Sequence, residues 1–168
     1  MRRAGLALSG LGLLVGAFAL LGTLGDPRAF PPALVLVVPW LGLVASCAGA
    51  ILLRGDSGWA GTASGAVLFA QGVAAITILA AGVSAERQNY WDAVHFAGLF
   101  WCATASAVCA MAVLVRRARR GSSAASFLVT VDGVLVGVCV VLLAWMTLPP
   151  VQEFEGWVAR TLYLLTHG

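Results

Sequence analysis

The sequence predicts an all-α integral membrane helical bundle: five transmembrane helices plus a C-terminal interfacial amphipathic helix. First, five long apolar runs follow one another, and only the last contains a charge, Asp132. Each is long enough, because about 20 helical residues cross a hydrocarbon layer of about 30 Å. Second, the chain is 61% hydrophobic and 10% charged, whereas soluble domains carry about 25% charged residues. Third, arginines are unevenly shared between alternate loops, as in multi-pass membrane proteins.

The apolar runs place the five helices in order along one membrane domain, residues 1–168. Proline cannot continue a helix, glycine favours turns, and aspartate can cap a helix start. A proline inside the second helix, Pro39, predicts a kink there. Residues of these kinds mark the predicted ends: Pro31, Pro32, Gly55, Gly58, Asp92, Pro149 and Pro150. The predicted helices cover about 4–24, 33–53, 59–83, 92–116 and 124–148.

The N-terminal run predicts a retained helix and not a cleaved signal peptide. Met1-Arg2-Arg3 followed by apolar residues is the start of a signal sequence too. However, this apolar stretch continues to Gly25, longer than the roughly 7–15 residues of a signal-peptide core, and no Ala-x-Ala-like site precedes Asp26.

The C-terminal segment, residues 153–168, differs from the five helices. Only thirteen residues follow Glu155, too few to cross the hydrocarbon layer. We expect this tail to lie along the outer membrane surface, held by Trp157, with Arg160 reaching the lipid headgroups. Trp157 and Arg160 are therefore candidate lipid or partner contacts.

The arginines predict the orientation of the chain. All ten basic residues are arginine, and seven of them fall on one side: Arg2, Arg3, Arg54, Arg116, Arg117, Arg119 and Arg120. Because cytoplasmic loops are enriched in basic residues, we expect the N-terminus in the cytoplasm and the C-terminus outside, in the inner (plasma) membrane. The four arginines from Arg116 to Arg120 are also candidate contacts for anionic lipid or an acidic partner. They form no groove-sized basic patch, so no nucleic-acid partner is expected.

Asp132 is the one ionisable side chain deep inside a predicted span. A charge there costs several kcal/mol, so we expect it to face the bundle or a water-filled cavity. Four other polar residues reach similar depth, and all five form a candidate intramembrane polar site: Asp132, Gln71, Ser46, Thr104 and Ser106. This layer has three interpretations: a proton or ion site, a structural hydrogen-bonding site between helices, or a substrate contact.

Other residue types give no catalytic, metal or cofactor signature. The four cysteines, Cys47, Cys102, Cys109 and Cys139, all lie in apolar runs without a Cys-x-x-Cys pair. They are interpreted as small apolar fillers, with a redox or metal role as the alternative. His95 could ligate haem or pass protons, but the second histidine is in the tail. We expect no cofactor, no metal and no catalytic residue.

Three Gly-x-x-x-Gly pairs lie within predicted helices. Small residues let membrane helices approach closely, so these faces predict packing inside the bundle, or docking of another chain as the alternative. The pairs begin at Gly12, Gly61 and Gly133.

The fourth predicted helix resembles a known family. The stretch Asp92-Ala-Val-His95-Phe-Ala-Gly-Leu-Phe100, with an apolar run ending in Arg-Arg, is similar to the DUF998 family of bacterial and archaeal membrane proteins. The tail Gly156-Trp-Val-Ala-Arg160-Thr-Leu-Tyr resembles that family's lead into a sixth helix, where this chain stops. The resemblance implies a bacterial-type six-helix bundle with a histidine near the start of the fourth helix, and no established activity.

Two functions from different classes follow from these features. The first is a non-enzymatic structural or accessory subunit of a larger membrane complex, because no catalytic motif accompanies the close-packing glycine faces. Its partners would be the lipid bilayer and other membrane subunits. The alternative is a small transporter or proton- or ion-conducting protein that uses Asp132. A membrane enzyme is the third hypothesis.

Overall fold

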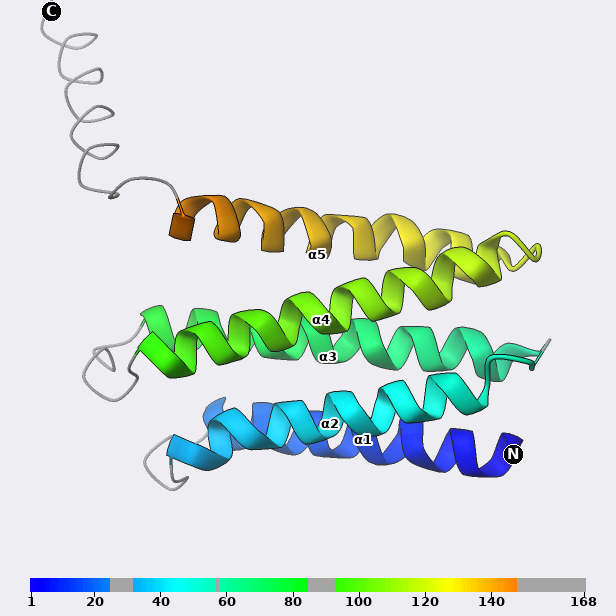
Figure 1. Cartoon of the computed structure of the whole chain (residues 1–168), viewed down its shortest axis with the longest axis horizontal. Helices are drawn as coiled ribbons and strands as arrows, with labels where there is room; N and C mark the ends of the chain where they lie inside the picture. The colour runs from blue at the N-terminus through cyan, green and yellow to red at the C-terminus, as the bar shows by residue number, and fades with distance from the viewer. Residues whose placement is uncertain (25–31, 57, 85–92, 148–168) are drawn as a thin grey trace, which may run out of the picture. The chain divides into compact units, whose positions relative to one another are not determined.

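In the part that the structure describes, the chain forms long helices joined by short turns. This computed structural model describes residues 1–24, 32–56, 58–84 and 93–147. Within those ranges five helices are present, and all are long and apolar enough to cross a membrane. They are α1 (Arg2–Leu24), α2 (Pro32–Leu52), α3 (Trp59–Ser84), α4 (Ala93–Ala118) and α5 (Ser123–Thr147), shown in Figure 1. Every bound lies within two residues of its predicted place, so the all-helical prediction is confirmed.

The chain divides into two compact units, residues 1–136 and 137–168. The second unit is described only for 137–147, the C-terminal part of α5. Helix packing is therefore defined for the first unit. The predicted cap Asp92 and the predicted interfacial tail, 153–168, lie outside the described residues and stay predictions.

Helices α1 and α2 pack through small residues that leave almost no space between their backbones. A Cβ placed on Gly12 of α1 would run into Ser46 Oγ and lie 3.0 Å from Ser46 N. The reverse pairing repeats further along, where a Cβ on Gly49 of α2 would run into Ser9 Oγ and lie 2.8 Å from Ser9 N. Each helix thus places a serine against a glycine of the other, as antiparallel neighbours permit. Gly12 therefore packs against another helix of the same chain, α2.

Helices α3 and α4 form the second close pair. A Cβ on Gly65 would lie 2.7 Å from Leu114 Cδ2, and one on Gly72 would lie 3.4 Å from Ala103 O. Leu114 is fully buried, and it belongs to an apolar core that draws on α2, α3, α4 and the start of α5: Leu43, Leu68, Cys102, Ala110, Leu114 and Ala125. The Gly61–Gly65 face is therefore also used inside the chain.

The turn between α4 and α5 has its own local signals. Gly121 has φ of +88°, a left-handed conformation that glycine adopts without a Cβ penalty. Ser122 then caps α5, because its Oγ accepts a hydrogen bond from Ala125 N at 3.3 Å. In α2, Pro32 is the first helical residue, a favoured place for proline. Pro39 lies inside α2, which continues through it to Leu52.

Candidate functional site

Asp132 is completely buried. It shares one face of α5 with Ala125 and Leu135, which are also buried, at seven- and three-residue spacing. Leu135 reaches α3, since a Cβ on Gly72 would lie 2.9 Å from Leu135 Cδ2. In the part of the chain that the structure describes, neither carboxyl oxygen of Asp132 has a hydrogen-bond partner. Asp132 is therefore a buried carboxyl group that receives no hydrogen bond from the described residues around it.

Gln71 of α3 occupies a different junction, between α1 and α2. Its Nε2 donates a hydrogen bond to Gly12 O at 2.8 Å. The glycines around it make room for the amide, because a Cβ on Gly42 would lie 3.1 Å from Gln71 Nε2 and one on Gly16 would lie 3.4 Å from Gln71 Cγ. Ser46 is buried at the same place, against Gly12, and its Oγ has no partner among the described residues. Gln71 and Ser46 thus meet at Gly12.

The two remaining polar residues of the predicted layer bond within their own helix. Thr104 Oγ1 donates to Phe100 O at 2.9 Å, and Ser106 Oγ donates to Cys102 O at 2.8 Å. Such bonds to the carbonyl four residues earlier satisfy a hydroxyl without a second helix. Among the described residues no hydrogen bond joins the five predicted polar side chains.

Several buried polar atoms lack partners within the described ranges. They are Ser9 Oγ, Ser46 Oγ, Gln71 Oε1 and both carboxyl oxygens of Asp132. Buried polar groups are normally paired, and an unpaired one costs about 1–3 kcal/mol. Asp132 has two such atoms, which makes it the residue of the predicted layer that most needs a functional or structural reason.

Arg117 behaves differently from the arginines beside it. It is only 5% exposed, and its guanidinium donates to Leu53 O at 2.8 Å and also to Asp56 O. Both carbonyls belong to the turn that follows α2, and Leu53 O also accepts a hydrogen bond from Asp56 N at 3.0 Å. Gly61 makes this possible, because a Cβ there would run into the guanidinium. The predicted lipid or partner contact of Arg117 stays a prediction; in the structure its guanidinium joins α4 to the α2–α3 turn.

The sequence offers no signal for this role of Arg117. Its partner Leu53 is 64 positions away, and a backbone carbonyl carries no residue signature. The pairing of Gly61 with an arginine is equally invisible, because Gly-x-x-x-Gly predicts only that some neighbour comes close.

Further contacts tie the same end of the bundle together. Arg2 Nε lies 2.9 Å from Asp56 Oδ2, and its guanidinium carbon lies 5.9 Å from the centre of the Trp59 ring. Across the end, Thr62 Oγ1 and Ser122 Oγ lie 3.4 Å apart. We call this region the arginine-rich end: the start of α1, the α2–α3 turn and the α4–α5 turn, with Arg2, Arg3, Arg54, Arg116, Arg117, Arg119 and Arg120.

A cleft of about 290 Å³ opens at the arginine-rich end between α2, α3 and α4. Its lining is mostly apolar with two cysteines and a serine, and it includes three arginines, of which Arg54 and Arg116 are exposed and Arg117 is buried. Cys47 of α2 and Cys109 of α4 both line it. The residues that line it are Cys47, Ala50, Ile51, Arg54, Ser64, Leu68, Cys109, Ala112, Val113, Arg116 and Arg117.

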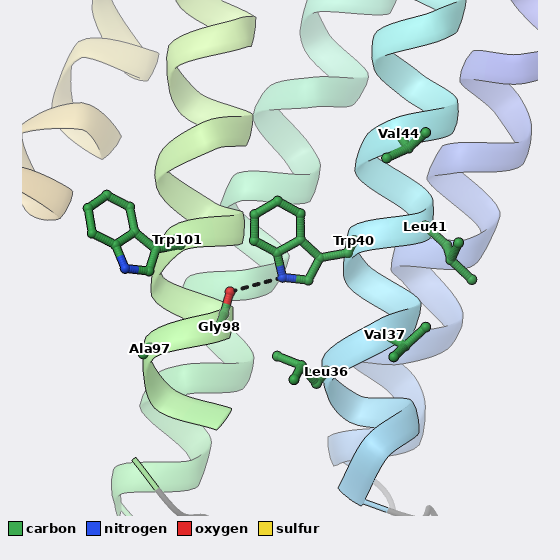
Figure 2. A pocket seen from close by; sticks show the side chains of 8 residues that line it. All are labelled: Leu36, Val37, Trp40, Leu41, Val44, Ala97, Gly98 and Trp101. Atoms are coloured by element: carbon green, nitrogen blue, oxygen red, sulfur yellow. Dashed lines mark hydrogen bonds between the residues drawn. The ribbon is translucent and has the colours of Figure 1, made fainter. Parts of the chain in front are cut away.

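A second groove, of about 670 Å³, runs between α2 and α4 toward their other end (Figure 2). Trp40 bridges the two helices there, because its Nε1 donates to Gly98 O at 3.2 Å. Trp101 stands on the α4 side and Leu36 on the α2 side. None of the described residues that line this groove is charged, so it suits apolar groups such as lipid chains. The indole N–H of Trp40 therefore joins α2 to α4.

Metal and cofactor sites are not evident in the described part of the chain. No three His, Cys, Asp or Glu side chains come together there as metal ligands would. His95 lies in the first turn of α4, and its side chain is outside what the structure describes. Trp157 and Arg160 also lie outside the described residues.

Comparison with protein-family models, curated proteins and solved structures gives no match for this chain. The resemblance to the DUF998 family therefore stays a prediction.

Proposed function

We propose that this chain is a multi-pass protein of the inner (plasma) membrane and a non-enzymatic structural or accessory subunit of a larger membrane complex. The membrane placement is supported by the apolar side chains that the helices expose. Leu14 and Leu21 of α1 are each 70% exposed and Ile51 of α2 is 71% exposed. Soluble proteins rarely expose so much apolar surface to water, whereas the hydrocarbon of a bilayer can cover it without a free-energy penalty.

The accessory role is supported chiefly by Gly133 of α5. Gly12 and Gly65 meet neighbouring helices so closely that a Cβ would clash. Gly133 does not: it is exposed, and the one atom near its Cβ position is Met111 Cε at 4.0 Å. Small residues on an open face let a second membrane helix approach to backbone distance. We infer that a helix of another subunit packs on the Gly133 face of α5.

The test is purification of the full chain in mild detergent with intact-complex mass spectrometry. Wild type should carry a partner in fixed stoichiometry. Gly133→Leu should lose that partner and stay folded, because the site is open. Gly10→Leu is the matched control, since nothing lies within 4 Å of a Cβ on Gly10 either. Wild type found alone would refute the accessory role, and a partner kept by Gly133→Leu would refute docking on this face.

For orientation, we propose that the arginine-rich end faces the cytoplasm. This rests on the seven-to-three distribution of arginines and the positive-inside rule. Ser122→Cys should then resist a membrane-impermeant thiol reagent in intact cells, whereas Gln88→Cys should be labelled. Labelling of Ser122→Cys from outside would reverse the topology.

A second function, a proton or ion conductor, is favoured by one observation. Asp132 is fully buried with both carboxyl oxygens unpaired among the described residues. An ionisable group within a membrane span is a common element of proton relays and ion pathways. In proteoliposomes with an entrapped pH dye, wild type should then collapse a proton gradient and Asp132→Asn should not. Equal leakage from both, matching empty liposomes, would exclude this function.

A further inference from the structure

We propose that the cleft at the arginine-rich end binds an anionic amphiphile: a phosphate-bearing lipid whose headgroup lies between Arg54 and Arg116 and whose acyl chain enters the cleft. Arg54 follows the end of α2, and Arg116 lies in the last turn of α4. Both are exposed and both line the cleft. Guanidinium groups bind phosphate with paired hydrogen bonds, so two of them at one mouth make a fitting receptor.

The charge around this mouth is uncompensated among the described residues. Arg116 lies within electrostatic reach of Arg54, Arg117 and Arg120, and all of them repel it. The nearby acid, Asp56, is already engaged with Arg2 at 2.9 Å. The guanidinium of Arg117 is already hydrogen-bonded to the backbone carbonyls of Leu53 and Asp56. An anion at the mouth would relieve this repulsion.

The interior of the cleft specifies the other half of the ligand. Apart from the arginines and Ser64 the lining is apolar, with buried Leu68 from α3, half-buried Val113 from α4 and exposed Ile51 from α2. The hydroxyl of Ser64 also lines the cleft, but it already donates to Gly61 O at 2.8 Å. A space of about 290 Å³ with this lining offers water few partners. An alkyl chain fills it and buries apolar surface. A charged mouth above an apolar interior therefore selects an amphiphile over a free anion.

This inference rests on the proposed membrane placement but not on the accessory role. Its test uses the purified full chain alone in neutral detergent, so it fails independently of any search for a partner. The probe is phosphatidylglycerol, with phosphatidylcholine as the zwitterionic comparison, and binding is measured by native mass spectrometry. Wild type should retain phosphatidylglycerol in preference to phosphatidylcholine.

Two double variants distinguish lipid binding at the cleft mouth from non-specific electrostatic attraction to the arginine-rich end. Arg54→Gln with Arg116→Gln removes the mouth, whereas Arg119→Gln with Arg120→Gln removes the same charge from exposed arginines that do not line the cleft. An arginine near an anionic lipid surface is worth about fivefold in affinity, so the first pair should weaken binding about thirtyfold. The second pair should weaken it by less than about threefold. Equal losses in the two would overturn the proposal.

The acyl chain is tested by filling the cleft. Ala112 lines it and is exposed, so Ala112→Phe should fold, checked by circular dichroism, and should weaken phosphatidylglycerol binding. A bound chain should also slow alkylation of Cys47 and Cys109 by N-ethylmaleimide, read peptide by peptide. Inorganic phosphate should do neither at equal concentration. If phosphate binds as tightly as the lipid and folded Ala112→Phe binds lipid as wild type does, the ligand is a soluble anion and the amphiphile proposal is wrong.

Discussion

The close approach of α1 and α2 predicts a large difference between two glycines of the same helix. Gly12→Ala adds a methyl group that would run into Ser46 Oγ, lie 2.7 Å from Gly42 O and lie 3.0 Å from Ser46 N. Two of these three obstacles are backbone atoms of α2, so no rotamer change can remove them. Gly10→Ala adds the same methyl group to α1 with nothing within 4 Å. The two variants differ only in what the methyl group meets.

The magnitude follows from that comparison. Alanine is a better helix former than glycine by about 0.8–1.0 kcal/mol, and both variants share this gain. Forcing an extra carbon into a filled interface costs about 1–3 kcal/mol. The gain cancels in the difference, so the free energy of unfolding of Gly12→Ala should lie about 1–3 kcal/mol below that of Gly10→Ala. Adding Ser46→Gly to Gly12→Ala should restore only part of the loss, because Gly42 O and the backbone of residue 46 remain.

The assay is titration of each purified variant from mild detergent into sodium dodecyl sulfate, followed by far-ultraviolet circular dichroism. The unfolding free energies of the two variants are then compared directly. Agreement within about 0.5 kcal/mol, the usual range for unconstrained surface changes, would show that α1 and α2 do not touch at Gly12. Full recovery on adding Ser46→Gly would show that a side chain, and not the α2 backbone, limits the approach.

Three further predictions concern single side chains. Arg117→Gln should lower the free energy of unfolding by at least about 1.5–3 kcal/mol, because it removes charge-assisted hydrogen bonds to backbone carbonyls. The control variant Arg119→Gln should change it by less than about 0.5 kcal/mol. Equal effects of the two variants would contradict the structural role of Arg117. Asp132→Leu should raise the free energy of unfolding by about 1–3 kcal/mol, since it removes two unpaired buried oxygens; a loss of stability in detergent titration would mean that the carboxyl group has a partner. Trp40→Phe should cost about 0.5–1.5 kcal/mol through the lost bond to Gly98 O, and an unchanged midpoint would show that this bond does not contribute.

Secondary structure was predictable because it depends on local chemistry. Five apolar runs bounded by proline, glycine and charged residues placed every helix end within two residues. The same pattern identified Asp132 as the charge inside a long apolar helix. The free-energy cost of exposing a charged side chain to hydrocarbon explains why Asp132 is buried within the protein. The glycine motifs at Gly12 and Gly61 also indicated that something approaches closely there.

The partners across helices were decided by tertiary structure alone. Asp132 and Gln71 lie at similar predicted depth, yet Gln71 reaches toward α1 and α2 while the face of Asp132 meets α3 through Leu135. The depth of a residue in the membrane follows from its position along the helix, because each residue adds a fixed rise of about 1.5 Å. Which neighbouring helix its side chain meets depends on how the helices are arranged. For the same reason Arg117 was indistinguishable from Arg116 in the sequence, although one helical step of about 100° turns the first into the fold and leaves the second at the mouth of a cleft.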